Sequence, residues 1–168
     1  MYAAFKSSVM SYVRYDGITC KYPRWFSNIM LDHVYVDEFG QSMYNLDVLV
    51  EGWDHFVRNR FGDVRRYCEE DFEKYYTSVN NFKCVPHDAV LECYIWDNID
   101  RKPPEWLLQA FQEGYIWKEY GTYWIIDYLT LDSVPMDPAW VVLRDSNGVL
   151  KYTPKYIFKE QFVTFEHL

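Results

Sequence analysis

The fold expected for the first half of the chain depends on residues 45–61, NLDVLVEGWDHFVRNRF. Asn45 belongs to the residue types that cap helix N-termini. The apolar side chains that follow it recur at the spacing of one helical face: Leu46, Leu49, Val50, Trp53, Val57 and Phe61. This pattern predicts a helix over residues 45–61.

A second helix is expected after the Gly62-Asp63 pair, which breaks the first. Asp63 can cap it, and one side of it carries Val64, Tyr67, Cys68, Phe72, Tyr75 and Val79. The short connection favours two antiparallel helices. Upstream, residues 33–37 alternate like a short strand, and residues 1–30 fit no single period. We therefore expect residues 1–82 to form a mainly helical region built on a helical hairpin.

Residues 83–168 show shorter elements with clear turn signals. Strands are expected at residues 89–96, 115–119, 122–128, 140–144, 149–152 and 162–165. A helix introduced by Pro104 ends at Gly114, and Thr153-Pro154 starts a single helical turn at residues 155–158. No internal repeat is evident. The predicted fold class is α+β, with a helical N-terminal region and a small antiparallel module at residues 83–168.

The composition combines many aromatic residues with excess acid. Aromatic residues make up 20% of the chain, and its net charge is −8. Direct binding to nucleic acid needs a basic patch. The one candidate patch consists of Arg58, Arg60, Arg65 and Arg66, and acids dilute it. No apolar run approaches the roughly 18 residues that span a bilayer. These features favour a cytoplasmic protein that binds neither nucleic acid nor membrane.

Motifs that carry catalysis or bind metals are missing from the sequence. The four histidines are isolated, and no phosphate-binding or nucleophile motif occurs. Cys84, His87 and Cys93 are a weak zinc candidate, because paired Cys-x-x-Cys spacing is absent. The four cysteines are better interpreted as buried thiols. We therefore expect no enzyme activity, no cofactor and no metal.

Several short motifs in the second half occur in the order seen in one family. They are residues 89–98 (AVLECYIWDN), residues 104–108 (PEWLL), residues 140–142 (WVV) and residues 148–158 (GVLKYTPKYIF). Through them, residues 88–168 resemble a family of small uncharacterised phage and prophage proteins of Gram-positive bacteria. Pro138-Ala139 stands where that family usually has Gly-Asp. The family has no established catalytic residues, and residues 1–82 do not match it. The resemblance implies a phage accessory protein acting in a bacterial cytoplasm.

Candidate binding residues come from the aromatic surplus and from the densest acidic run. Tyr and Trp are common anchors of protein interfaces, although many aromatic residues must be core. The acidic run can form a DNA-mimicking face, or a solvated helix surface in which Arg66 pairs with Glu70 and Glu70 with Lys74. The candidate interaction surface consists of Tyr22, Trp25, Phe26, Glu69, Glu70, Glu73, Tyr94, Trp96 and Asp97.

The function expected from these features is inhibition of a host antiviral defence complex, such as a CRISPR–Cas effector, by a non-enzymatic phage protein. Its partner is then a host defence protein or ribonucleoprotein, and self-association into a homodimer stays open. Two alternatives belong to other classes. One is a small-molecule-binding protein that sequesters a nucleotide signal by stacking its base on aromatic side chains. The other is a phage structural or assembly protein.

Overall fold

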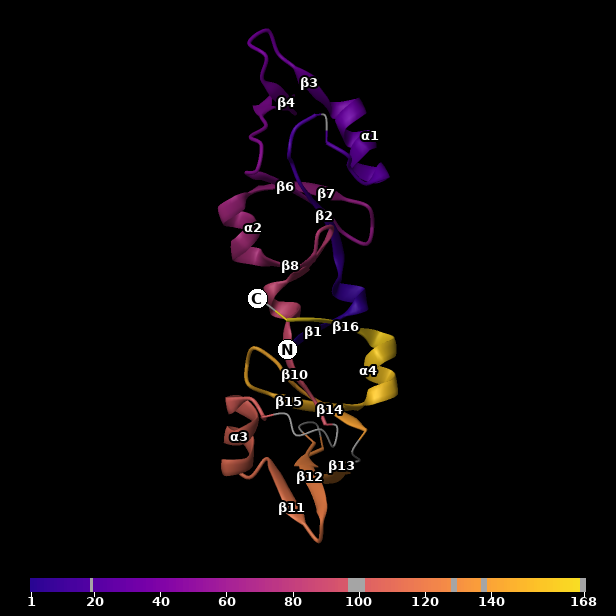
Figure 1. Cartoon of the computed structure of the whole chain (residues 1–168), viewed down its shortest axis with the longest axis vertical. Coiled ribbons are helices and arrows are strands. Elements are labelled where there is room, and N and C mark those ends of the chain that lie inside the picture. Colours follow the sequence, from indigo (N-terminus) through magenta and orange to yellow (C-terminus); the bar gives the residue numbers. More distant parts are fainter. Residues whose placement is uncertain (19, 97–101, 128–129, 137–138, 167–168) are drawn as a thin grey trace. The chain divides into compact units, whose positions relative to one another are not determined.

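The computed structural model describes residues 1–18, 20–96, 102–127, 130–136 and 139–166 (Figure 1). The chain divides into two compact units. The first unit is Ser8–His87, and the second unit combines Met1–Ser7 with Asp88–Leu168. Among the described residues, no helix is both long enough and apolar enough to cross a membrane.

The first unit is built on a five-stranded antiparallel sheet. Its strand order is β7-β6-β2-β9-β8. The strands are β2 (Met10–Arg14), β6 (Asp54–Arg58), β7 (Val64–Cys68), β8 (Tyr76–Asn80) and β9 (Lys83–Pro86). A three-stranded sheet of β3 (Val34–Val36), β4 (Ser42–Tyr44) and β5 (Asp47–Val48) accompanies it. The helices are α1 (Arg24–His33) and α2 (Glu69–Tyr75).

The second unit has the same composition of elements. Its five-stranded sheet has the order β15-β14-β10-β1-β16. These strands are β1 (Tyr2–Phe5), β10 (Leu91–Ile95), β14 (Trp140–Arg144), β15 (Leu150–Pro154) and β16 (Phe162–Phe165). The three-stranded sheet contains β11 (Ile116–Glu119), β12 (Thr122–Ile126) and β13 (Ser133–Met136). The helices are α3 (Glu105–Gln112) and α4 (Lys155–Gln161).

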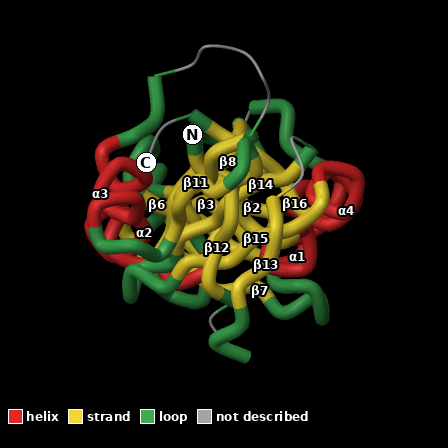
Figure 2. The backbone as a smooth tube through the Cα atoms, turned by 90° about the horizontal axis from the view of Figure 1, so that it is seen from below, coloured by secondary structure: helices red, strands yellow, loops and turns green. Residues whose placement is uncertain are grey.

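The two units therefore repeat one topology. In each, a sheet strand leads to a helix, a three-stranded meander, a hairpin, a second helix and an edge strand. The 3-10 turns η1 (Lys6–Ser8) and η2 (His87–Ala89) also occupy equivalent places, before β2 and β10. In both views the two helices of a unit lie on opposite sides of its strands (Figures 1 and 2).

The repeats exchange one strand. β1 precedes the first repeat in sequence but lies between β10 and β16, whereas β9 precedes the second repeat and lies between β2 and β8. The hydrogen bonds are equivalent: Tyr12 N–H donates to the Phe82 carbonyl, and Cys93 N–H donates to the Met1 carbonyl, both at 3.0 Å. Each sheet is thus completed by the strand that begins the other repeat.

The repeat was not evident in the sequence because few side chains are shared. Residues that coincide at equivalent positions are Pro23 with Pro104, Trp25 with Trp106, Arg58 with Arg144, Gly62 with Gly148, and Phe72 with Phe158. At most other equivalent positions the two repeats have different residues, and only the direction of the side chain, toward the core or away from it, is the same. The two large sheets nevertheless have equivalent strand orders and pairing registers, so the chain contains an internal repeat, contrary to the expectation from the sequence.

Each large sheet buries both of its faces. In the first unit, Phe56 packs with Phe26 of α1, and its neighbour Val57 packs with Phe72 of α2. In the second unit, Val142 packs with Leu107 of α3, and its neighbour Leu143 packs with Phe158 of α4. Because successive strand residues point to opposite faces, the two helices of a unit cover opposite sides of its sheet.

The expected α+β class with a helical N-terminal region built on a helical hairpin is wrong, because the described residues form mainly antiparallel β-sheet in both units. Residues 45–61 form a turn, strand β5, a loop and strand β6. Asn45 and Leu46 have φ values of 48° and 70°, the conformation of a two-residue hairpin turn, and they join β4 to β5. Asn45 therefore supplies a positive φ rather than a helix cap. Only Val57 of the six apolar residues lies on β6. Leu46, Val50, Trp53 and Phe61 are exposed, so their helical spacing does not mark a buried face.

The second expected helix, beginning at Asp63, is also wrong over most of its length. Val64–Cys68 pairs with β6 as strand β7, and the segment is helical only over Glu69–Tyr75 before β8 begins. Three acidic residues, Glu69, Glu70 and Asp71, occupy the first turn of α2. Acids are stabilising there because the N-terminus of a helix is electropositive.

Candidate functional site

A groove occurs at the same place in both repeats, between the first helix and the turn of the β-hairpin that follows the meander. In the first unit it measures about 590 Å³ and is lined by Arg24, Trp25, Asn28, Ile29, Arg58, Gly62 and Val64. In the second unit it measures about 540 Å³ and includes the equivalent Trp106, Gln109, Ala110, Arg144, Gly148 and Leu150. A site kept through a repeat whose sequence has diverged is a candidate functional site.

The helix side of the groove is set by proline. Pro23 and Pro104 precede α1 and α3, and their carbonyls accept hydrogen bonds from Phe26 N–H (2.9 Å) and Leu107 N–H (3.0 Å). Proline suits the start of a helix because its φ is already fixed near the helical value. Its missing backbone N–H costs no hydrogen bond there, because the first N–H groups of a helix have no partner within the helix. The tryptophan two residues later lines the groove in both units.

The hairpin side is set by a turn of identical construction. The side-chain oxygen of Asn59 accepts hydrogen bonds from Phe61 N–H (2.9 Å) and Asp63 N–H (3.0 Å). Asp145 accepts the equivalent pair from Asn147 and Val149, both at 3.0 Å. Asn and Asp commonly close turns in this way.

The turn glycine lies beside an arginine in both grooves. Gly62 and Gly148 have φ values of 96° and 81°, which glycine adopts without strain. A Cβ atom at Gly62 would lie 3.7 Å from Arg58 Nη2, and one at Gly148 would lie 3.9 Å from Arg144 Nε. Both distances are ordinary van der Waals contacts, so the positive φ, and not the space beside the arginine, favours glycine here.

The two grooves differ in charge. Arg144 of the second unit forms an ion pair with Glu92 at 3.2 Å, and Glu113 also lines that groove. In the first unit, the Arg58 guanidinium carbon lies 5.9 Å from the centre of the Trp25 ring, and Arg24 stands nearby. The first groove is therefore cationic, whereas the second carries both signs.

Comparisons with protein-family models, curated proteins and solved structures found no match to this chain.

The second repeated feature is an apolar row on the outward face of each three-stranded sheet. In the first unit, Tyr35 pairs with Met43, and Met43 pairs with Val48. In the second unit, Trp117 pairs with Trp124, and Trp124 pairs with Pro135. We call these two sets the outward rows.

The outward rows point away from the core because their strand neighbours pack into it. Val34 and Tyr44 contact the core of the first unit, and Ile116 and Ile125 belong to that of the second. Tyr35 is 47% exposed and Val48 40% exposed. The Trp117 and Trp124 rings stack with centroids 6.5 Å apart. Sequence reasoning missed these rows. It predicted the strands at 115–119 and 122–128 but did not assign their residues to an inward and an outward face.

The aromatic candidates predicted near residue 25 contribute mainly to packing. Phe26 is fully buried and contacts Tyr22, Trp25 and Phe56 edge-on or tilted. The Tyr22 hydroxyl accepts from Asp16 N–H (2.7 Å) and donates to the Gly17 carbonyl (2.9 Å). Burial raises the pKa of Tyr22. Trp25 alone of the three lines the groove.

The remaining candidates belong to both units. Tyr94 and Trp96 pack against the core of the second unit, with their ring centroids 5.8 Å apart. Glu69, Glu70 and Glu73 lie on α2 of the first unit, with Glu70 and Glu73 exposed. Asp97 lies outside the described residues. The described members of the predicted set thus fall in both units: Tyr22, Trp25, Phe26 and the three glutamates in the first, and Tyr94 and Trp96 in the second.

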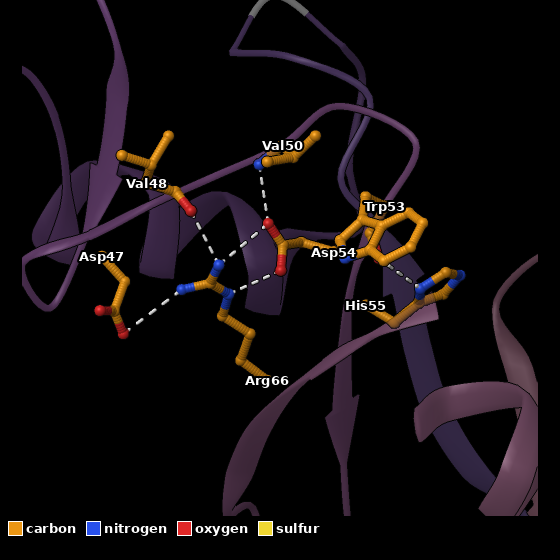
Figure 3. Close-up of polar contacts among 7 residues, drawn as sticks. All are labelled: Asp47, Val48, Val50, Trp53, Asp54, His55 and Arg66. Carbon is orange, nitrogen blue, oxygen red and sulfur yellow. Dashed lines mark hydrogen bonds and ion pairs between the residues drawn. The ribbon is translucent and has the colours of Figure 1, made fainter. Parts of the chain in front are cut away.

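A buried ion pair ties β5 to the large sheet of the first unit (Figure 3). Asp54 is 1% exposed and accepts hydrogen bonds from Val50 N–H (2.7 Å), Arg66 Nε (2.7 Å) and Arg66 Nη2 (3.1 Å). Arg66 also donates to the Val48 carbonyl at 2.8 Å and lies 3.5 Å from Asp47. The partner expected for Arg66, Glu70, is replaced by Asp54 because Arg66 lies on a strand.

His55, Cys84 and Cys93 are buried, whereas Cys20 is exposed, so the expectation that all four cysteines are buried thiols is wrong. His55 stacks on Phe72 with centroids 4.4 Å apart, and its Nδ1 lies 3.2 Å from the Trp53 carbonyl. Burial lowers the pKa of His55. Burial also raises the pKa of Cys84 to about 12 and that of Cys93 to about 11. Among the described residues, no group of three metal-ligating side chains gathers.

Proposed function

We propose that this protein is a non-enzymatic phage accessory protein that binds a host antiviral defence complex, such as a CRISPR–Cas effector, and inhibits it in the bacterial cytoplasm. The observation that carries the proposal is the pair of outward rows. Tyr and Trp anchor protein interfaces because they contribute a large contact area at low cost in conformational entropy. Each unit carries one such row, so each unit offers an apolar surface to a partner.

Two further features support this function. The resemblance of residues 88–168 to phage proteins points to an infected bacterial cell. The net charge of −8 favours a partner with a basic surface, such as the nucleic-acid channel of a defence complex. The acidic side chains Glu70 and Glu73, exposed on α2, are available to such a surface.

The test is an inhibition assay with purified effectors from candidate host defence systems. The wild-type protein should co-elute with its target effector and block that effector's binding or cleavage of DNA. Tyr35→Thr and Trp124→Thr, which keep β-propensity but remove an anchor from each outward row, should weaken inhibition. Tyr120→Ser is the matched control, because Tyr120 is 98% exposed in the turn between β11 and β12. Full effector activity at molar excess across the systems would refute the proposal.

A further inference from the structure

Two arginines converge on the groove of the first unit without acidic partners. Arg24 reaches it from the first turn of α1, and Arg58 from the end of β6. Within the described part of the chain, no carboxylate forms an ion pair with either. Arg14, Arg66 and Arg144 each have such a partner. In a chain with net charge −8, this pair is a local concentration of uncompensated positive charge.

The position of Arg24 adds to the case for an anionic ligand. The N-terminus of a helix is electropositive, so a cation in the first turn is unfavourable there unless an anion lies close by. Pro23, which precedes α1, offers no side-chain cap. The second unit has an acid, Glu105, at the position equivalent to Arg24. The first repeat therefore differs from the second repeat, because it has a cation at a position where an anion would be favoured.

The same groove also offers surfaces for a flat ring. The indole of Trp25 is half-buried, and Ile29 and Val64 line the groove beside it. The side-chain amide of Asn28 is exposed and can both donate to and accept from the edge of a base. A cavity of about 590 Å³ lies in the size range of sites for small organic ligands.

We propose that this groove binds a phosphorylated nucleoside, either as a free nucleotide or as part of a single strand. Arg24 and Arg58 hold the phosphate, because guanidinium groups match its geometry with paired hydrogen bonds. Trp25 and Ile29 contact the base, and Asn28 reads its edge. This site is independent of the proposed inhibition, because the residues of the outward rows do not line it.

The test measures binding of the four ribonucleoside 5′-monophosphates by calorimetry and by tryptophan fluorescence. Adenosine, inorganic phosphate and a short single-stranded oligonucleotide are the comparison ligands. Arg24→Gln and Arg58→Gln should each weaken binding of a monophosphate about tenfold or more. Arg65→Gln removes an exposed charge on β7 that does not line the groove, and it should change affinity by less than about twofold.

The comparison ligands decide what is recognised. Tighter binding of the oligonucleotide than of any monophosphate, lost in the same two variants, would support the site and identify a strand as its source. No binding of any monophosphate or of the oligonucleotide at millimolar concentration would overturn the proposal. So would equal affinity for adenosine and adenosine monophosphate, since the arginines would then not recognise phosphate. Equal losses of affinity for a monophosphate in Arg65→Gln and Arg58→Gln would show a general effect of charge, and this result would also overturn the proposal.

Discussion

Asp54 holds Arg66 by two hydrogen bonds at the position where the second unit packs the tilted rings of Trp140 and Tyr152 together. The carboxylate oxygens of Asp54 lie 2.7 and 3.1 Å from Nε and Nη2 of Arg66. The rings of Trp140 and Tyr152 have centroids 4.6 Å apart. Equivalent positions on neighbouring strands are therefore occupied by an ion pair in the first repeat and by an aromatic pair in the second. Figure 3 shows the ion pair.

Removing one partner of this ion pair should destabilise the protein strongly. Asp54→Ala leaves the Arg66 guanidinium without its buried partner, so we expect unfolding in urea to show a loss of about 3 kcal/mol. Arg66→Ala should cost a comparable amount, and the double variant should cost less than the sum of the two by about 1 kcal/mol or more. Additive losses would contradict direct coupling of the two side chains.

The strand exchange predicts the effect of a short N-terminal deletion. β1 lies between β10 and β16, and its Ala3 and Ala4 are fully buried. Deleting residues 1–5 should therefore disrupt the sheet of the second unit, although the deleted residues adjoin the first unit in sequence. Amide hydrogen exchange should show lost protection in residues 88–166 and retained protection in β2, β6 and β7.

The first unit serves as the internal control in that experiment, because β9 completes its sheet and is not deleted. Retained protection in β10 and β16 of the deletion variant would contradict the exchange of strands.

His55 should make stability depend on pH. Its folded-state pKa is lowered by burial below the unfolded value of about 6.5, so the unfolded state binds the proton more readily. The stabilisation is thus present above about pH 6.5 and is lost as the pH falls toward and through the folded pKa. His55→Val, which copies the equivalent Val141, should flatten this part of the profile. Parallel melting-temperature profiles of the two proteins between about pH 8 and pH 5 would refute the role of His55.

Thiol reactivity should separate the cysteines. The raised pKa values of Cys84 and Cys93 leave almost no thiolate at about pH 8, and both side chains are buried. Cys20 is exposed. Alkylation of the native protein followed by mass spectrometry should therefore label Cys20 first, and labelling of Cys84 and Cys93 should require unfolding. Rapid labelling of Cys84 in the native protein would contradict its buried position.

Local signals were sufficient for most elements of the second half. Pro104 and Gly114 bracket α3, and the strand predicted at Trp140–Arg144 is β14 itself. In the first half, the strand Asp54–Arg58 is buried on both faces and carries an aspartate and a histidine. It therefore lacks the alternation that identifies a half-buried strand, and its neighbours imitate a helical face.

The candidate sites could not be predicted because they depend on pairing across the chain. Trp25 was a candidate, but its grouping with Arg58 requires α1 and the β6–β7 hairpin to be placed together. The outward rows likewise join residues from three strands each. The placement of β1 between β10 and β16 pairs residues far apart in the sequence, which no local pattern specifies, whereas β9 follows β8 as a local hairpin.

The most direct measurement of the proposed function is phage plating on bacteria that carry a defence system and express this protein. The wild-type protein should restore plaque formation on at least one such strain, and the Tyr120→Ser control should do the same. The combined Tyr35→Thr and Trp124→Thr variant, expressed at the same level, should not restore it. Unchanged protection across a broad panel of defence systems, or restoration by the combined variant equal to that of the wild type, would contradict the account.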